Sequence, residues 1–144
     1  MNDILAVLED ERVMMYELLR HAQTQQTALI HHDADELERL AAEQQELLAT
    51  MQQKEVSRWK ILAATLNIST REASQMAMSE LIPKLEGYEQ DVFKKLQTEL
   101  KGLLNEWQLL NATNRVLAFR ARASVKEILT FFAESDVRVC NVRV

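Results

Sequence analysis

One apolar stripe, between Lys84 and Phe132, constrains this chain more than any other feature. The stretch contains no proline, and its apolar residues recur three, four or seven positions apart: Leu85, Val92, Leu96, Leu103, Trp107, Leu110, Leu117, Ala121, Ile128 and Phe132. This spacing places one stripe along one side of a helix, which would be roughly 70 Å long at ~1.5 Å per residue. A helix of this length cannot bury its stripe against itself. The rest of the chain, or another protein, must therefore pack against it.

The composition predicts an all-α fold. The chain has 144 residues with only two glycines and one proline, and these two residue types are the main helix breakers. The length suits one domain. We expect residues 1–133 to form a single helical bundle domain and residues 134–144 to form a flexible C-terminal tail. The tail has a strand-like alternation of valines, but a lone strand has no ladder to join.

The hydrophobic pattern divides the bundle into two long N-terminal helices, a short helix and the very long C-terminal helix. Their expected ranges are Asp3–Ile30, Ala34–Leu66, Thr70–Leu81 and Lys84–Phe132. Gly87 is an alternative start of the last helix, because a glycine inside a helix costs roughly 1 kcal/mol relative to alanine. Asp33 and Ser69 are each followed three residues later by a glutamate, which is the spacing of a capping box at a helix N-terminus. A tight turn before Ala34 predicts that the first two helices are antiparallel.

Charge is distributed unevenly between the ends of the chain. Residues 1–33 contain six acids and two bases, whereas residues 83–133 contain six acids and eight bases. This difference favours antiparallel packing of the first helix against the last, although exposed pairs contribute little each. The adjacent acids Glu9, Asp10 and Glu11 are predicted to form a solvated face.

Composition also argues against several classes of protein. The net charge of −5 does not suit a nucleic-acid binder, which usually has a basic face. The single cysteine, Cys140, cannot form an intramolecular disulfide and fits a reducing compartment. The sequence has no signal-peptide pattern and no apolar run of the ~20 residues that a membrane span needs. We expect a soluble cytoplasmic protein with no membrane insertion.

No motif in the chain carries catalytic or cofactor chemistry, so we expect neither an enzyme nor a cofactor. The one metal-like cluster comprises His31, His32, Asp33 and Asp35. We predict that it is a solvated turn, because the spacing of its side chains does not let them converge on one ion. A basic run comprises Arg115, Arg120, Arg122 and Lys126. We interpret it as an ordinary solvent-exposed face of the helix. The alternative is a patch that binds an acidic partner.

Two asparagines interrupt the apolar stripe of the long helix. The stretch reads Leu-Asn-x-x-Asn-x-x-Leu from Leu110 to Leu117, and a buried asparagine can set the register of packed helices. This stretch resembles the FlgN-type flagellar export chaperones, as does the order of the helices before it, including the leucine-rich run Leu37–Leu48. The resemblance covers about residues 4–130.

The resemblance implies a non-enzymatic chaperone of bacterial flagellum biogenesis and type III secretion. Such a chaperone binds C-terminal amphipathic helices of hook-associated (hook–filament junction) proteins, prevents their premature assembly and delivers them to the export apparatus. The export gate is a further partner that the resemblance implies.

We expect the client to bind along the C-terminal half of the long helix and the start of the tail, because the stripe there outruns the helices available to cover it. The predicted client-binding residues are Leu110, Asn111, Asn114, Leu117, Ala121, Val125, Ile128, Phe131, Phe132 and Val137. The alternative is a homo-oligomeric coiled-coil scaffold without a secretion client, in which self-association satisfies the same stripe. A weak homo-oligomer is compatible with either function.

Overall fold

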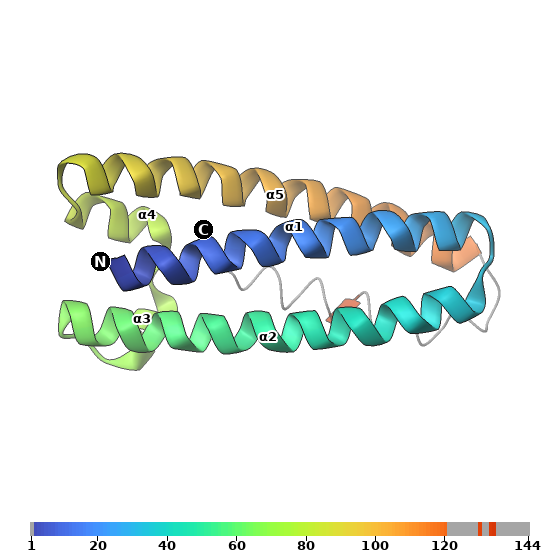
Figure 1. The fold of residues 1–144 in the computed structure, drawn as a ribbon, viewed down its shortest axis with the longest axis horizontal. Helices are drawn as coiled ribbons and strands as arrows, with labels where there is room; N and C mark the ends of the chain where they lie inside the picture. The colour runs from blue at the N-terminus through green and yellow to red at the C-terminus, as the bar shows by residue number, and fades with distance from the viewer. Residues whose placement is uncertain (1, 121–129, 131–132, 135–144) are drawn as a thin grey trace.

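The computed structural model describes residues 2–120, 130 and 133–134, and the predicted all-α bundle is confirmed (Figure 1). The described elements, in chain order, are α1 (Asn2–Ile30), α2 (Ala34–Leu66), α3 (Thr70–Gln75), α4 (Met78–Leu81), the 3₁₀ helix η1 (Ile82–Lys84) and α5 (Gly87–Arg120). The predicted end of the long helix at Phe132 lies beyond this described part, as does the predicted tail apart from Glu134.

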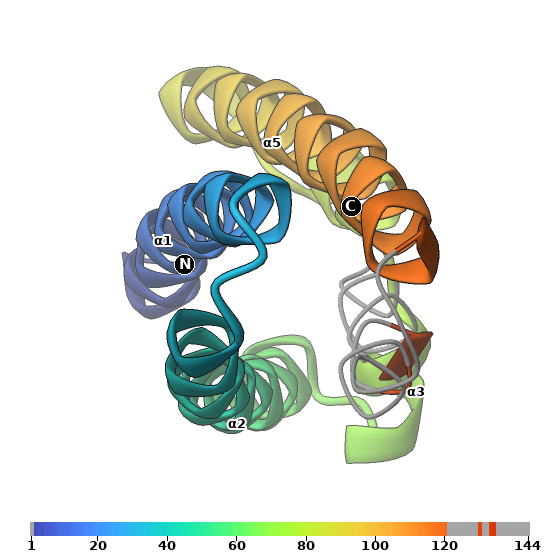
Figure 2. The same cartoon turned by 90° about the vertical axis from the view of Figure 1, so that its right-hand side faces the viewer.

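Helix α1 is the central element of the bundle. It packs along α2 on one side and along α5 on the other, as the end-on view shows (Figure 2). Helices α1 and α2 are antiparallel, as predicted. Helices α1 and α5 run in the same direction (Figure 1), so the predicted antiparallel packing of the first helix against the last is wrong.

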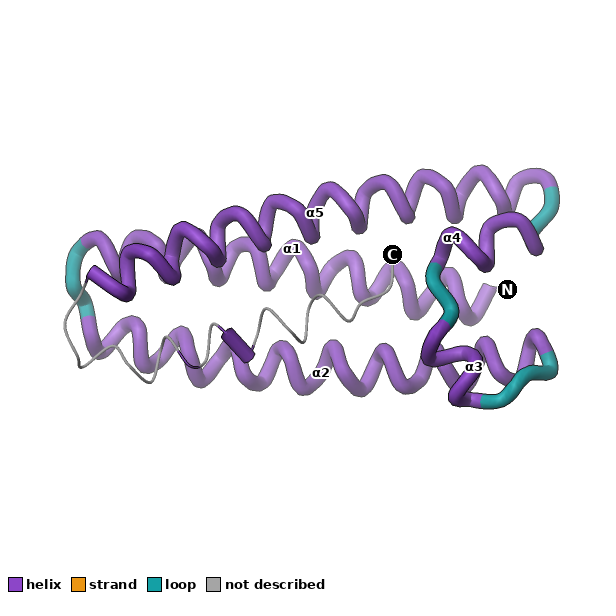
Figure 3. The backbone as a smooth tube through the Cα atoms, turned by 180° about the vertical axis from the view of Figure 1, so that it is seen from behind, coloured by secondary structure: helices purple, strands orange, loops and turns teal. Residues whose placement is uncertain are grey.

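The order of the long helices explains this correction. Three long helices that run up, down and up place the first and third in the same direction. The segment from α3 to η1 stays at one end of the bundle and returns the chain to the start of α5 (Figure 3). Chain connectivity therefore outweighs the charge difference between the two helices, because exposed ion pairs are screened by solvent and contribute little energy.

Both predicted helix caps before α2 and α3 are present. The backbone N–H of Glu36 donates to Oδ1 of Asp33 over 3.1 Å, and the N–H of Glu72 donates to Oγ of Ser69 over 3.1 Å. Each bond satisfies an N–H that the first turn of a helix leaves unpaired. At the other end of α2, Asn67 adopts a left-handed conformation with φ of 55°, which closes the helix at Leu66 as predicted.

Two predicted helix boundaries are corrected. The single short helix expected over Thr70–Leu81 is divided into α3 and α4, because Met76 and Ala77 adopt extended backbone conformations between them. The long helix starts at Gly87, the alternative start indicated by its sequence, rather than at Lys84. Leu85 is extended after η1, and Gly87 has φ of 56°, a conformation that glycine adopts without steric cost.

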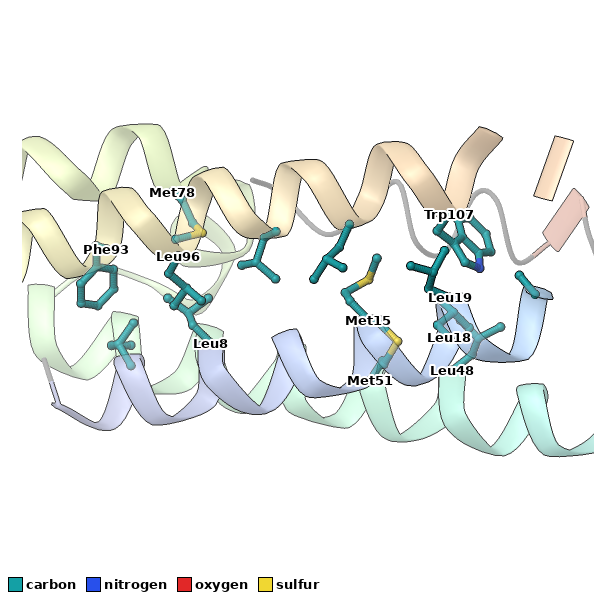
Figure 4. Close-up of a cluster of buried hydrophobic side chains, with 14 of the residues drawn as sticks. Leu8, Met15, Leu18, Leu19, Leu48, Met51, Met78, Phe93, Leu96 and Trp107 are labelled. Carbon is teal, nitrogen blue, oxygen red and sulfur yellow. The ribbon is translucent and has the colours of Figure 1, made fainter. Parts of the chain in front are cut away.

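The core is continuous along the bundle and is formed by one stripe from each long helix (Figure 4). Phe93 lies towards one end and Trp107 towards the other, with Leu96 and Met15 among the side chains between them. Trp107 has no exposed surface. Since interior packing is dense and apolar burial is favourable, this stripe holds α5 against α1.

Two buried polar contacts join α1 to α2. The Glu11 carboxylate accepts from Nη1 of Arg58 over 2.7 Å, and Nε2 of Gln25 donates to Oε1 of Gln44 over 2.6 Å. Glu11 is only 2% exposed, so its predicted place on a solvated face is wrong. Its position on the helix points it at α2, and Arg58 supplies the counter-charge that a buried carboxylate requires.

Candidate functional site

The candidate site is the C-terminal half of α5. Of the ten residues predicted for client binding, the structure describes four, all on this helix. Leu110 and Leu117 are half-buried, whereas Asn111 and Asn114 are buried. The other six, which lie outside the described residues, are Ala121, Val125, Ile128, Phe131, Phe132 and Val137.

The two asparagines occupy the side of α5 that packs on the bundle. Nδ2 of Asn114 donates a hydrogen bond to the backbone carbonyl of Ala22 on α1 over 2.8 Å. This bond is completely buried, and it ties α5 to α1 at one position along the helix. Both polar atoms of the Asn111 amide are buried without a hydrogen-bond partner in the described part of the chain.

This difference between the asparagines predicts opposite effects of the same substitution. We expect Asn111→Leu to raise the free energy of unfolding by about 1 kcal/mol, because it removes an unpaired buried amide. Asn114→Leu is expected to lower it by about 1 kcal/mol, because it breaks a made hydrogen bond. Urea denaturation of both variants measures the contrast. Equal losses of stability in the two variants would contradict the role assigned to Asn114.

Two side chains of α1 meet a carboxylate at the middle of α5. Nη1 of Arg12 lies 3.3 Å from Oε2 of Glu99, and the Tyr16 hydroxyl donates to Oε1 of Glu99 over 2.9 Å. The hydrogen bond to the carboxylate raises the pKa of Tyr16 above its ordinary value. These contacts and the Asn114 bond define how α5 lies on α1.

A second apolar stripe runs along the outer side of α5, and the sequence prediction missed it. We define the outer stripe as Leu109, Ala112, Val116 and Phe119. Leu109 and Phe119 are each 73% exposed, and Val116 is 51% exposed. At 3.6 residues per turn, these residues point away from the side that carries Trp107. Their spacing of three, four and three was visible in the sequence, but the inward stripe masked it.

The outer side of α5 changes character along its length. Nearer the start of the helix, this side carries exposed polar or small residues: Lys94, Lys95, Thr98, Lys101, Gly102 and Asn105. It becomes apolar only from Leu109 onwards. A helix that is apolar on two opposite sides is normally buried on both, and in the described structure only the inward side of this segment is covered.

The structure places part of the predicted His-Asp cluster at the turn between α1 and α2. His31 and Asp33 line an open surface pocket together with Arg20 and Glu36, so both signs of charge are present. Within residues 2–120, 130 and 133–134, no three His, Cys, Asp or Glu side chains are grouped so that they could hold a metal ion. In the same residues, no helix has the length and apolar character needed to cross a bilayer.

The family comparison bears directly on this arrangement of helices. The family model described as FlgN protein matches residues 1–140. The chain belongs to the FlgN family. This match spans all the described helices, and it confirms the resemblance noted in the sequence. FlgN membership gives the chain the general role of a flagellar export chaperone. No curated protein and no solved structure matches the chain.

Proposed function

We propose that this FlgN-family protein binds the C-terminal amphipathic helices of hook–filament junction proteins and keeps them unassembled in the cytoplasm. The family match over residues 1–140 carries the proposal. The geometry supports it, because the C-terminal half of α5 has more apolar surface than α1 covers. Exposed apolar patches on soluble proteins commonly mark sites of protein binding.

The proposed client surface is the C-terminal half of α5 together with the residues that follow it in sequence. It comprises the half-buried Leu110 and Leu117 together with Ala121, Val125, Ile128, Phe131, Phe132 and Val137. Asn111 and Asn114 are buried against the bundle, and Asn114 serves to hold α5 in register on α1, since its amide already bonds to Ala22. Helix-in-groove recognition is the physical mode, with apolar anchors at helical spacing on the client.

Delivery is the second half of the proposed role. A client held in this way is transferred to the flagellar type III export apparatus, whose export gate is the further proposed partner. Binding must therefore be tight enough to prevent assembly and still reversible.

The direct test mixes the purified chain with a purified hook–filament junction protein from the same cells. We expect a defined complex by light scattering and suppression of client polymerisation at equimolar ratio. A client that lacks its C-terminal helical segment is the control, and it should polymerise with or without the chain. Absence of a complex with every such client would refute the proposal. A tight homo-oligomer that survives dilution and binds no client would instead support the scaffold alternative.

A further inference from the structure

We propose that two copies of the chain associate weakly through the outer stripe of α5, with the two α5 helices antiparallel. The outer stripe comprises Leu109, Ala112, Val116 and Phe119, as defined above, and it points away from the side of α5 that packs on α1. This dimer forms in the free protein, so it does not depend on which client the chain binds.

The spacing of the outer stripe suits a twofold pairing with itself. Its intervals of three, four and three residues read the same in both directions, and they are those of alternating a and d positions in a heptad repeat. A twofold axis across the middle of the stripe places Leu109 against Phe119 of the second copy. The same axis places Ala112 against Val116 of the second copy, so each layer pairs a larger side chain with a smaller one.

A parallel pairing of the same stripe packs less well. It places Ala112 against Ala112 and Phe119 against Phe119, so one layer is underfilled and another is crowded. Dense packing disfavours both defects. The order of side-chain sizes along the stripe therefore favours the antiparallel direction.

Charges on one flank of the stripe favour the same direction. In this heptad frame Glu106 and Arg120 occupy e positions, which face e positions of the other helix in an antiparallel pair and set its orientation. Both side chains are exposed, and the ion pairs of the described residues involve neither of them. They lie roughly 21 Å apart along α5 at ~1.5 Å per residue, too far to pair within one chain. In the dimer, Glu106 of each copy faces Arg120 of the other.

The remaining charges of α5 do not oppose this pairing. Its other exposed charged residues all precede the paired segment, beyond the reach of the described helix of the second copy: Glu89, Asp91, Lys94, Lys95 and Lys101. Arg115 lies on the other flank, where it is half-buried and already makes an interaction within its own chain.

The length of the paired segment sets the strength of the dimer. An interface of standard size buries about 800 Å² on each partner, and smaller interfaces belong to weak, transient complexes. A stripe of a few turns falls in the smaller class. We therefore expect a reversible dimer that dissociates on dilution.

Sedimentation velocity of the full-length chain, over a series from about 1 μM to 1 mM, measures this association. We expect the weight-average mass of the wild type to rise with concentration. Leu109→Asp combined with Phe119→Asp should remain monomeric throughout, with the circular dichroism of the wild type, because both side chains are largely exposed. Tyr88→Asp is the matched control. Tyr88 is 83% exposed on the same helix but lies outside the paired segment, so this variant should associate as the wild type does.

Charge reversal tests the antiparallel direction and does not depend on the folding of the double aspartate variant. Glu106→Arg alone and Arg120→Glu alone should each weaken association about tenfold at low salt, because each places like charges opposite one another twice in the dimer. An equimolar mixture of the two variants should recover wild-type association, since in the mixed dimer opposite charges again face one another at both sites.

A wild type that stays monomeric over the whole series would overturn the inference. Undiminished association of the double aspartate variant would also do so, because the interface would then lie elsewhere. A mixture of the two charge variants that associates no better than either one alone would refute the antiparallel pairing. If the double aspartate variant loses only client affinity, or only co-sedimentation with anionic phospholipid vesicles, the stripe serves that partner and the dimer is excluded.

Discussion

Replacing Arg58 with methionine is expected to lower the free energy of unfolding by about 3–5 kcal/mol, because it leaves Glu11 buried without its counter-charge. Arg58 is 4% exposed. Its guanidinium contacts Glu11 at 2.7 Å and Glu55 at 3.8 Å, so one cation serves two carboxylates between α1 and α2. Urea denaturation at pH 9, where Glu11 is ionised in the wild type, measures the loss.

A second substitution identifies the cause of this loss. Combining Arg58→Met with Glu11→Leu removes both charges, and apolar residues of similar volume often replace a buried ion pair at little cost. We therefore expect the double variant to recover most of the lost stability. If the double variant is as unstable as Arg58→Met alone, the loss comes from packing around Arg58 rather than from the unpaired carboxylate.

The same site makes stability depend on pH. Burial raises the pKa of Glu11 from its ordinary value of 4.5 to about 7, against the opposing effect of Arg58. Between pH 4.5 and 7 the folded state holds a proton on Glu11 that the unfolded state has lost. The stabilisation of the folded state by this proton is therefore complete below about pH 4.5 and is lost as pH rises through 7. This amounts to about 3 kcal/mol. Glu11→Gln should flatten this part of a pH series of unfolding curves, and an unchanged slope would contradict the assignment.

Truncating Trp107 to alanine is expected to cost about 3–5 kcal/mol, which is the range for removing a large aromatic side chain from a packed core. Trp107 has no exposed surface and lies just past the middle of α5. The cavity would loosen α5 from α1 at the level of the candidate site. Thermal unfolding followed by circular dichroism measures the effect.

Trp107→Phe is the matched control for this prediction. The Trp107 Nε1–H is buried and has no hydrogen-bond partner in the described residues. Phenylalanine removes this unpaired donor while it keeps most of the aromatic volume, so we expect a loss well below that of alanine. If Trp107→Ala unfolds at the temperature of the wild type, Trp107 does not hold α5 in place.

Local signals in the sequence predicted the helices well. The capping spacing at Asp33 and Ser69 marked where α2 and α3 begin, because a cap involves residues only three positions apart. Gly87 was recognisable as an alternative start of α5, because a glycine is unfavourable inside a helix. The interruption at Met76 was less accessible. It depends on how the short segments fit against the end of the bundle, which is a tertiary effect.

The candidate site was predictable only in part. The sequence indicated the C-terminal half of the long helix and suggested that Asn114 sets register, a role its bond to Ala22 supports. It did not reveal the outer stripe, since two heptad-like patterns overlap on one helix and only the packed structure shows which one faces α1. It also placed Glu11 in solvent, because an acidic run does not reveal that one of its members faces a buried arginine.

The central position of α1 has a consequence for how the chain folds. Its contacts with α2 close shorter loops, such as the one between Gln25 and Gln44, which are 19 residues apart, whereas Ala22 and Asn114 are 92 residues apart. Closing a longer loop costs more chain entropy, and contacts between distant residues slow folding. We expect the α1–α2 hairpin to form early and α5 to dock onto it late. The helix proposed to hold the client is then the last to join the bundle and the first to show amide exchange.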